Sequence, residues 1–235
     1  MKINKLKIKQ RWEHALGDRI DDVRCTEVWN LEWTDEGIYV CGRWDDQAYI
    51  QPGPATLECW LFSPMGKKYY TEVLDFNESS KPTSKLEKNG WVCDLTKKNG
   101  SKSVHQDEMR KLPLKNKAPD TSADLTSPDN KMVIEFTSDN EAFHIQEKKT
   151  GKEICHIDYS PMNLKFSPDG TLLATESLMD HTIRIWDTKS GEELARKSLG
   201  EQHVGIGLFV WSPSGDALAG VRMVRNILTV WEISQ

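Results

Sequence analysis

Apolar and polar residues alternate along short stretches of this chain, and turns that contain glycine or proline separate the stretches. The pattern is clearest in residues 163–197, where a Ser-Pro-Asp-Gly turn, a run that ends in Trp186–Asp187 and a Lys-Ser-Gly turn follow one another. A period of two residues is typical of β-strands, and proline and glycine favour tight turns. The segment therefore predicts four short antiparallel strands, over residues 164–166, 172–174, 183–186 and 193–197.

The same pattern returns along the chain at intervals of about forty residues. Residues 210–232 repeat it with a second Ser-Pro-x-Gly turn and Trp231 before an acid, and residues 125–154 repeat it with Gln146 in place of Trp186. Residues 30–37 parallel residues 163–170, and residues 91–95 resemble the end of a third strand. A small sheet cannot bury its faces alone, so such units are expected to pack against one another.

These repeats resemble the WD-repeat family, which is recognised by a four-stranded blade and a tryptophan–aspartate end. The resemblance implies an all-β fold, a β-propeller of about five four-stranded antiparallel blades. In that family a turn Asp, a strand Trp, a Ser or Thr and a His form a hydrogen-bonded tetrad. Asp180, Trp186 and either Ser177 or Thr175 match three members, and His156 lies near the expected place of the fourth.

Residues 5–12 also alternate between lysine or other polar residues and apolar ones. In the WD-repeat family an N-terminal strand completes the last blade, so the resemblance implies that these residues pair beside residues 228–233 and close the ring. A free basic tail is the alternative. The chain is then expected to be a single propeller over residues 1–235, with clear repeats over 125–235, weaker repeats over 25–75 and an irregular blade with a basic loop over 76–124.

Charge is distributed unevenly along a chain whose net charge is −5. Residues 81–118 hold ten Lys and Arg against four Asp and Glu, with Trp91 as their only aromatic residue. Nucleic-acid binding usually combines basic charge with stacking aromatics or a groove-reading element. We therefore expect a solvated loop here and do not expect nucleic acid as a partner, with polyanion binding through residues 81–118 as an alternative function.

Cysteine usage and hydropathy suggest a compartment. The chain has five cysteines, widely spaced and without a Cys-x-x-Cys pair, which favours a reducing, cytoplasmic setting. No apolar run approaches the roughly 20 residues that span a bilayer, and the basic N-terminus lacks the apolar core of a secretory signal. We expect no membrane partner.

The sequence offers no catalytic motif. It contains no Gly-x-Ser-x-Gly elbow, P-loop or His-Glu-x-x-His segment. The six histidines show no metal-ligand spacing with one another or with cysteine. We therefore expect a protein that is not an enzyme and that uses no cofactor and no metal.

Interface-forming residue types lie in the turns that the repeats align. In the WD-repeat family the residue before the turn Asp lies on the loop face and contacts partners; here it is Met179, with His181 nearby. In the last repeat Arg225 replaces the turn Asp, and Arg222 lies close by. In the first repeat Arg43–Trp44 leads into an insertion. Tryptophan, arginine and methionine are enriched at interface cores.

The resemblance thus implies a noncatalytic protein-interaction scaffold that binds a protein or peptide on the loop face of the propeller. The alternative reading of these residues is that they are ordinary exposed turn residues. A small-ligand or carbohydrate-binding propeller is a further alternative, although it would need an aromatic platform in each blade, and Trp44 has no counterpart in the other turns.

Overall fold

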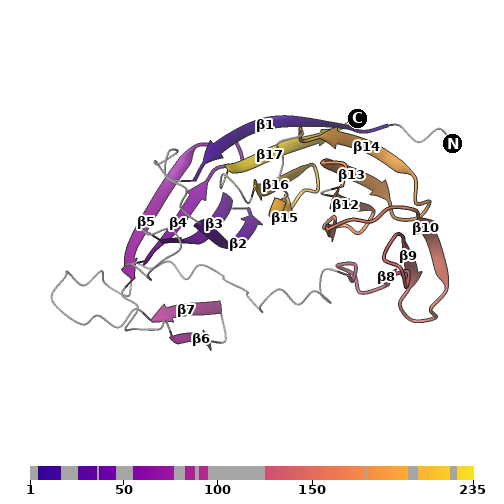
Figure 1. Ribbon diagram of the computed structural model, residues 1–235, viewed down its shortest axis with the longest axis horizontal. Coiled ribbons are helices and arrows are strands. Elements are labelled where there is room, and N and C mark those ends of the chain that lie inside the picture. The colour runs from indigo at the N-terminus through magenta and orange to yellow at the C-terminus, as the bar shows by residue number, and fades with distance from the viewer. Residues whose placement is uncertain are drawn as a thin grey trace.

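The computed structural model describes residues 5–16, 26–35, 37–45, 55–76, 83–87, 90–94, 125–177, 179–200, 206–222 and 227–235. Within these ranges the regular elements are all β-strands, and they form five antiparallel sheets (Figure 1). This confirms the all-β class predicted from the alternating pattern.

The fourth sheet along the chain contains four strands in chain order. They are β11 (Asn163–Phe166), β12 (Leu172–Ser177), β13 (Thr182–Asp187) and β14 (Glu193–Ser198). The turn between β11 and β12 depends on Gly170, whose φ of 72° lies in the left-handed region. The Ser167 hydroxyl donates to Asp169 and accepts the Leu172 N–H, at 2.6 and 2.9 Å. The four strands predicted from this repeat are confirmed.

The last sheet joins the two ends of the chain. Its strands β15 (Ile206–Trp211), β16 (Ala217–Arg222) and β17 (Ile227–Ser234) follow one another, and β1 (Lys7–Ala15) is the fourth and outer strand. β1 runs antiparallel to β17, from the pair Lys7–Ser234 to the pair Ala15–Ile227. The predicted pairing of the N-terminal strand beside residues 228–233 is therefore confirmed.

The other three sheets come from the first half of the chain and from residues 125–157. The first contains β2 (Thr26–Thr34), β3 (Gly37–Asp45), β4 (Ala55–Phe62) and β5 (Lys68–Phe76). The second is the pair β6 (Thr83–Glu87) and β7 (Gly90–Asp94). The third contains β8 (Met132–Phe136), β9 (Phe143–Glu147) and β10 (Glu153–Ile157). A single bridge between Thr126 and Val133 lies where each four-stranded sheet has a further strand.

Apolar side chains are buried between neighbouring sheets. One cluster joins the third sheet to the fourth, with Phe143 and Leu173 both 0% exposed. A second joins the fourth sheet to the last, and a third joins the last sheet to the first. These four sheets therefore stand side by side in an arc (Figure 1). This is the packing of β-propeller blades, and we call these four sheets the first, third, fourth and last blades in chain order.

Strand β1 contacts three successive blades. The Leu6 N–H donates to the Leu194 carbonyl on β14 at 2.9 Å, so the residue before β1 is bonded to the fourth blade. Trp12 donates its indole N–H to the Pro64 carbonyl at 2.9 Å, and Pro64 lies in the β4–β5 turn of the first blade. β1 itself belongs to the last blade. The N-terminal strand thus ties the last blade to both of its neighbours.

Candidate functional site

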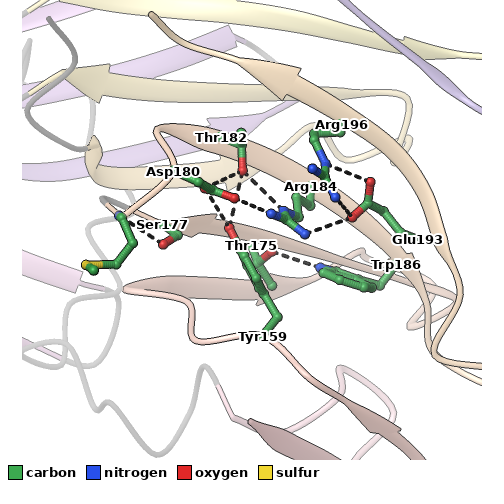
Figure 2. Close-up of polar contacts among 10 residues, drawn as sticks. Tyr159, Thr175, Ser177, Asp180, Thr182, Arg184, Trp186, Glu193 and Arg196 are labelled. Atoms are coloured by element: carbon green, nitrogen blue, oxygen red, sulfur yellow. Dashed lines mark hydrogen bonds and ion pairs between the residues drawn. The ribbon is translucent and has the colours of Figure 1, made fainter. Parts of the chain in front are cut away.

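The turn between β12 and β13 is the part of the predicted loop face that the structure describes best. Its Asp180 carboxylate accepts hydrogen bonds from the Thr182 hydroxyl at 2.7 Å and from the Tyr159 hydroxyl at 3.3 Å. Arg184 forms an ion pair with the same carboxylate. Figure 2 shows these groups converging on Asp180. The turn is therefore fixed by partners from β13 and from the segment between β10 and β11.

Arg184 extends this network along the sheet. Its side chain is only 13% exposed, its guanidinium lies 4.0 Å from the centre of the Tyr159 ring, and it donates to Glu193 at 3.0 Å. Glu193 also pairs with Arg196 at 2.8 Å. Alternating acid and base side chains thus run from the turn to β14, as Figure 2 shows. Because each charge has a partner, the partial burial of Arg184 is compensated.

Trp186 supplies the apolar side of the site. Its indole N–H donates to the Thr175 hydroxyl at 2.8 Å, and its side chain is 6% exposed. Of the two alternatives left open by the sequence, Thr175 is thus the partner of Trp186. The Ser177 hydroxyl instead accepts the Met179 N–H at 3.2 Å.

The structure does not bring His156 to Asp180. The His156 ring contacts Asp158 and His144 instead, at 2.6 and 3.2 Å. The residue that reaches Asp180 from the neighbouring segment is Tyr159, whose ring centre lies 5.5 Å from that of Trp186. Sequence reasoning did not single out Tyr159. One feature of the sequence could have indicated Tyr159: it is the only aromatic residue between β10 and β11.

The hydrogen bonds and the burial around Asp180 shift the pKa values of the titratable groups in this network. Partial burial opposes ionisation of Asp180, but the hydrogen bonds from Thr182 and Arg184 outweigh it and hold the pKa of this carboxyl below its usual value. Burial raises the pKa of the Tyr159 hydroxyl, so the phenol stays protonated and can donate to Asp180. Burial likewise opposes the ionisation of Glu193, and its bonds to Arg196 and Arg184 again lower the pKa.

We expect Asp180 to make stability depend on pH. A carboxyl with a lowered folded-state pKa contributes stability that is complete above its unfolded pKa, about 3.9, and is lost as pH falls through the folded pKa. The free energy of unfolding of Asp180→Asn, measured with urea, should therefore lie below that of the wild type at pH 7 and approach it as pH falls below about 4. If the difference in unfolding free energy between the wild type and Asp180→Asn is unchanged or larger at pH 3, this role of Asp180 is contradicted.

Met179 and His181 flank Asp180 in the turn. The Met179 side chain is 89% exposed. His181 has a φ of 53°, in the left-handed region, and its Nδ1 is buried without a hydrogen-bond partner. The adjacent segment places Met162, which is 57% exposed, beside the end of β12, because the Met162 N–H donates to the Glu176 carbonyl at 2.7 Å. Two exposed methionines thus lie next to the same strand end.

The end of β12 is also bonded to the last blade. Glu176 is 0% exposed, and its carboxylate accepts the Ile206 N–H at 3.2 Å and the Asn163 side-chain amide at 3.0 Å. Asn163 in turn donates to the Ile206 carbonyl at 2.7 Å. These bonds hold the strand that carries the turn at a fixed position between two blades.

Of the remaining predicted interface residues, the structure describes the side chain of Arg222 only. Arg222 at the end of β16 pairs with Glu13 of β1 at 3.0 Å and is 28% exposed, so its guanidinium has a partner within the fold. Arg43 and Trp44 belong to the backbone of β3, but their side chains lie outside the described residues, as does Arg225 as a whole.

In the last blade, Arg225 takes the place of the turn Asp. The last blade also differs from the fourth at the position that matches Thr175. By alignment of the two Ser-Pro-x-Gly turns, Gly220 takes the place of Thr175. A Cβ at Gly220 would stand 3.0 Å from the Trp231 ring and 2.9 Å from Ile206, so the ring occupies the space that a threonine would need. The last blade thus replaces the polar pair with apolar packing.

Two further findings limit the kind of site. Within the described ranges, no group of three or more His, Cys, Asp or Glu side chains could hold a metal ion. In the same part of the chain, no helix is long and apolar enough to cross a membrane.

Comparison with known proteins agrees with the repeat read from the sequence. Residues 148–187 match the family model described as WD domain, G-beta repeat. Residues 148–187 are therefore similar to one WD repeat. The matched segment spans β10 to β13, so its first strand belongs to the third blade and the others belong to the fourth. The sequence repeat thereby links two neighbouring blades.

The known proteins to which this chain is similar are distant from it in sequence. A probable inactive protein kinase of Dictyostelium discoideum is 27% identical over 146 residues, which cover 57% of this chain and 10% of that protein. Among solved structures, Hsv2 of Kluyveromyces lactis is 16% identical with a TM-score of 0.36, covering 83% of this chain and 46% of that one. A chain of a mitotic checkpoint complex is 11% identical with a TM-score of 0.39, covering 88% and 64%. The chain thus spans less than half the length of Hsv2 and a small part of the kinase-named relative.

Proposed function

We propose that this WD-repeat chain is a noncatalytic interaction scaffold that binds a partner protein or peptide on one loop face. This face, which we call the Met179 face, comprises the β12–β13 turn, the β10–β11 segment and the matching ends of β3 and β16. The observation that carries the proposal is the exposed Met179 side chain on a turn held by Asp180. An apolar side chain on a fixed turn can be buried by a partner with little loss of conformational freedom.

Methionine suits this role for two reasons. Its unbranched, polarizable side chain adapts to the shape of a partner, and methionine is enriched at interfaces relative to other surfaces. Met162 and Met179 are bonded through their backbones to the consecutive residues Glu176 and Ser177 of β12. Together they offer two neighbouring apolar groups beside the Asp180 network.

The opposite face supplies an internal comparison. In an antiparallel sheet, the turn between the third and fourth strands lies at the same end as the turn between the first and second. The β4–β5 turn, with Met65 74% exposed, therefore lies at the opposite end of its blade from the end of β3 and the start of β4. Met65 matches Met179 in residue type and exposure but lies away from the Met179 face.

We expect Met179→Asp to abolish capture of the partner, because it places a charge where apolar contact is needed. Tagged wild-type chain, Met179→Asp and the matched control Met65→Asp would be incubated with native lysate, and retained proteins would be identified by mass spectrometry. The account predicts a protein that wild type and Met65→Asp retain and that Met179→Asp loses.

Melting temperatures of the three proteins would be compared first, and both substitutions should leave them nearly unchanged because the side chains are exposed. Capture that survives Met179→Asp and disappears with Met65→Asp would contradict the proposal. Capture that disappears only when the lysines of residues 97–117 are neutralised would assign binding to the basic segment.

The proposal includes a reducing, cytoplasmic setting. Cys155, the cysteine whose side chain the structure describes, is 8% exposed, and its thiol contacts the Thr188 carbonyl at 3.6 Å. Burial raises the pKa of this thiol, which keeps it in the less reactive protonated form. Cys155 therefore acts as a small apolar core residue.

A further inference from the structure

One serine differs in its surroundings from the other serines that precede a proline. The sequence contains five Ser-Pro pairs and no Thr-Pro pair, and all five serines lie in the described part of the chain. Four of these serines begin tight turns and are between 1% and 6% exposed: Ser63, Ser127, Ser167 and Ser212. Ser160, in the segment between β10 and β11, is exposed. Of the five Ser-Pro hydroxyls, only that of Ser160 is therefore presented to solvent.

The hydroxyls of the four buried serines hold their own turns together. The Ser127 hydroxyl accepts the Met132 N–H at 2.9 Å, and each of the other three accepts the N–H of a residue four or five positions further along the chain. The Ser160 hydroxyl instead donates to the Asn140 carbonyl at 2.8 Å, in an exposed hydrogen bond. Another molecule can therefore reach the Ser160 oxygen without opening a turn that this oxygen supports.

The backbone at Ser160 suits recognition by an enzyme that binds extended segments. Residues 158–161 form neither strand nor helix and connect β10 to β11. Pro161 disfavours the helical conformation of Ser160 and favours an extended one, and Pro161 has no N–H of its own. A kinase whose apolar pocket offers no acceptor for the N–H after the phosphorylated residue therefore prefers serine followed by proline. This preference defines the proline-directed kinases.

We propose that Ser160 is a phosphorylation site for a proline-directed serine/threonine kinase and that phosphate at Ser160 weakens partner binding on the Met179 face; the second part rests on the proposed function. In the transfer, Oγ of Ser160 forms a bond to the γ-phosphorus of ATP. The bond between that phosphorus and the β–γ bridging oxygen breaks, and ADP leaves. The hydroxyl proton of Ser160 passes to a carboxylate of the kinase.

The position of Ser160 within the Met179 face explains the effect of a phosphate on binding. Ser160 directly follows Tyr159, whose hydroxyl donates to Asp180, and it lies two residues before Met162, which is 57% exposed. A phosphate on serine carries a charge of about −1.5 to −2 at pH 7. A partner that covers Met162 and Met179 must then desolvate or closely approach this charge, which costs binding free energy.

The neighbouring third-blade turn adds to the repulsion. Asp139 and Glu141 flank Asn140, whose carbonyl accepts the Ser160 hydroxyl. Phosphorylation removes the donated proton and sets a charged group against this carbonyl and these carboxylates. A phosphate beside Asp and Glu repels them instead of pairing with them. We therefore expect the modification to loosen the contact between the β10–β11 segment and the β8–β9 turn.

Incubation of the full-length chain with ATP and a purified proline-directed kinase tests the site, with one cyclin-dependent and one mitogen-activated kinase in separate reactions. Peptide mapping by mass spectrometry should find phosphate at Ser160 of the wild type and none at the four buried Ser-Pro serines. Pro161→Ala keeps the hydroxyl, but it introduces an N–H that the kinase leaves without an acceptor, so phosphorylation of Ser160 should fall by at least about tenfold.

Melting curves would establish that Pro161→Ala is folded. An unmodified Ser160 with both kinases would overturn the assignment of the site. Equal phosphorylation of Ser160 in the wild type and in folded Pro161→Ala, or phosphate spread equally over the five Ser-Pro serines, would overturn it as well.

The effect on binding is tested with the unmodified wild type, the phosphorylated wild type and Ser160→Ala, each folded and each incubated with native lysate that contains phosphatase inhibitors. Retention of the partner should fall by at least about tenfold on phosphorylation. Ser160→Ala loses the hydroxyl without gaining charge and should retain the partner like the unmodified wild type.

The outcomes separate this proposal from the proposed function. Equal retention by the phosphorylated and unmodified chains would overturn the effect of the phosphate on binding. If no form retains a partner, the proposed function and this effect are both overturned, whereas the mapping of phosphate to Ser160 is decided by the kinase reactions alone.

Discussion

Trp186→Ala is expected to lower the free energy of unfolding by about 3–5 kcal/mol. The indole is buried in the cluster that joins the third and fourth blades, so its removal leaves a cavity at a blade interface. Unfolding in guanidinium chloride, followed by far-ultraviolet circular dichroism, measures the change without relying on tryptophan fluorescence.

Two companion variants separate packing from hydrogen bonding. Thr175→Val keeps the shape of the side chain but leaves the Trp186 N–H without its partner, which should cost about 1–3 kcal/mol. Met179→Ala changes an exposed residue and should stay within about 0.5 kcal/mol of the wild type. If Trp186→Ala unfolds like Met179→Ala, the assignment of Trp186 to the blade interface is wrong.

Removal of residues 1–15 should produce the second large effect, a fall in melting temperature of roughly 10 °C or more. The deletion takes away β1, exposes the edge of β17 and removes the apolar contacts of Leu6, Ile8 and Trp12. Partial burial of three such side chains is worth about 4 kcal/mol in total, and about 2–4 °C corresponds to each kcal/mol in a chain of this size.

The matched control is removal of residues 1–4, which leaves β1 intact and should melt like the full chain. A synthetic peptide of residues 1–15, added in excess to the truncated chain, should restore part of the lost stability in a concentration-dependent way. Equal melting temperatures for the two truncations, or no response to the peptide, would contradict the role of β1 in joining three blades.

The strands of the fourth blade could be predicted because their signals are local. Alternation sets the strands, and the Ser-Pro-Asp-Gly and Lys-Ser-Gly turns set their ends. The pairing of β1 with β17 was predictable for a different reason: the resemblance to the WD-repeat family implies an N-terminal strand beside the last repeat, and residues 5–12 have the alternation of one. The repeat itself thus supplied the long-range contact.

The details of the site required coordinates. Thr175 and Ser177 lie on the same side of β12, so periodicity alone cannot choose between them. The register pairs Leu173 with Trp186 and puts Thr175 at the near diagonal position, within reach of the indole. The choice of Tyr159 over His156 depends on how the β10–β11 segment crosses the blade, which no pattern in the sequence encodes.

Ion pairs between residues far apart in the chain also could not be predicted from the sequence. Arg222 has the sequence context of an exposed turn residue, but its partner Glu13 lies 209 residues away on β1. The pairing of His144 with His156 likewise depends on the register between β9 and β10. Such contacts follow from strand order, which the composition of either segment does not reveal.

Methionine oxidation by hydroxyl radicals, compared between the free chain and the chain bound to its captured partner, tests the central claim most directly. Met65, Met162 and Met179 are all exposed and should all oxidise in the free chain. The account predicts that the partner protects Met162 and Met179 and leaves Met65 unprotected. Unchanged oxidation of Met179, with protection of Met65 or of Met109 in the basic segment, would contradict it.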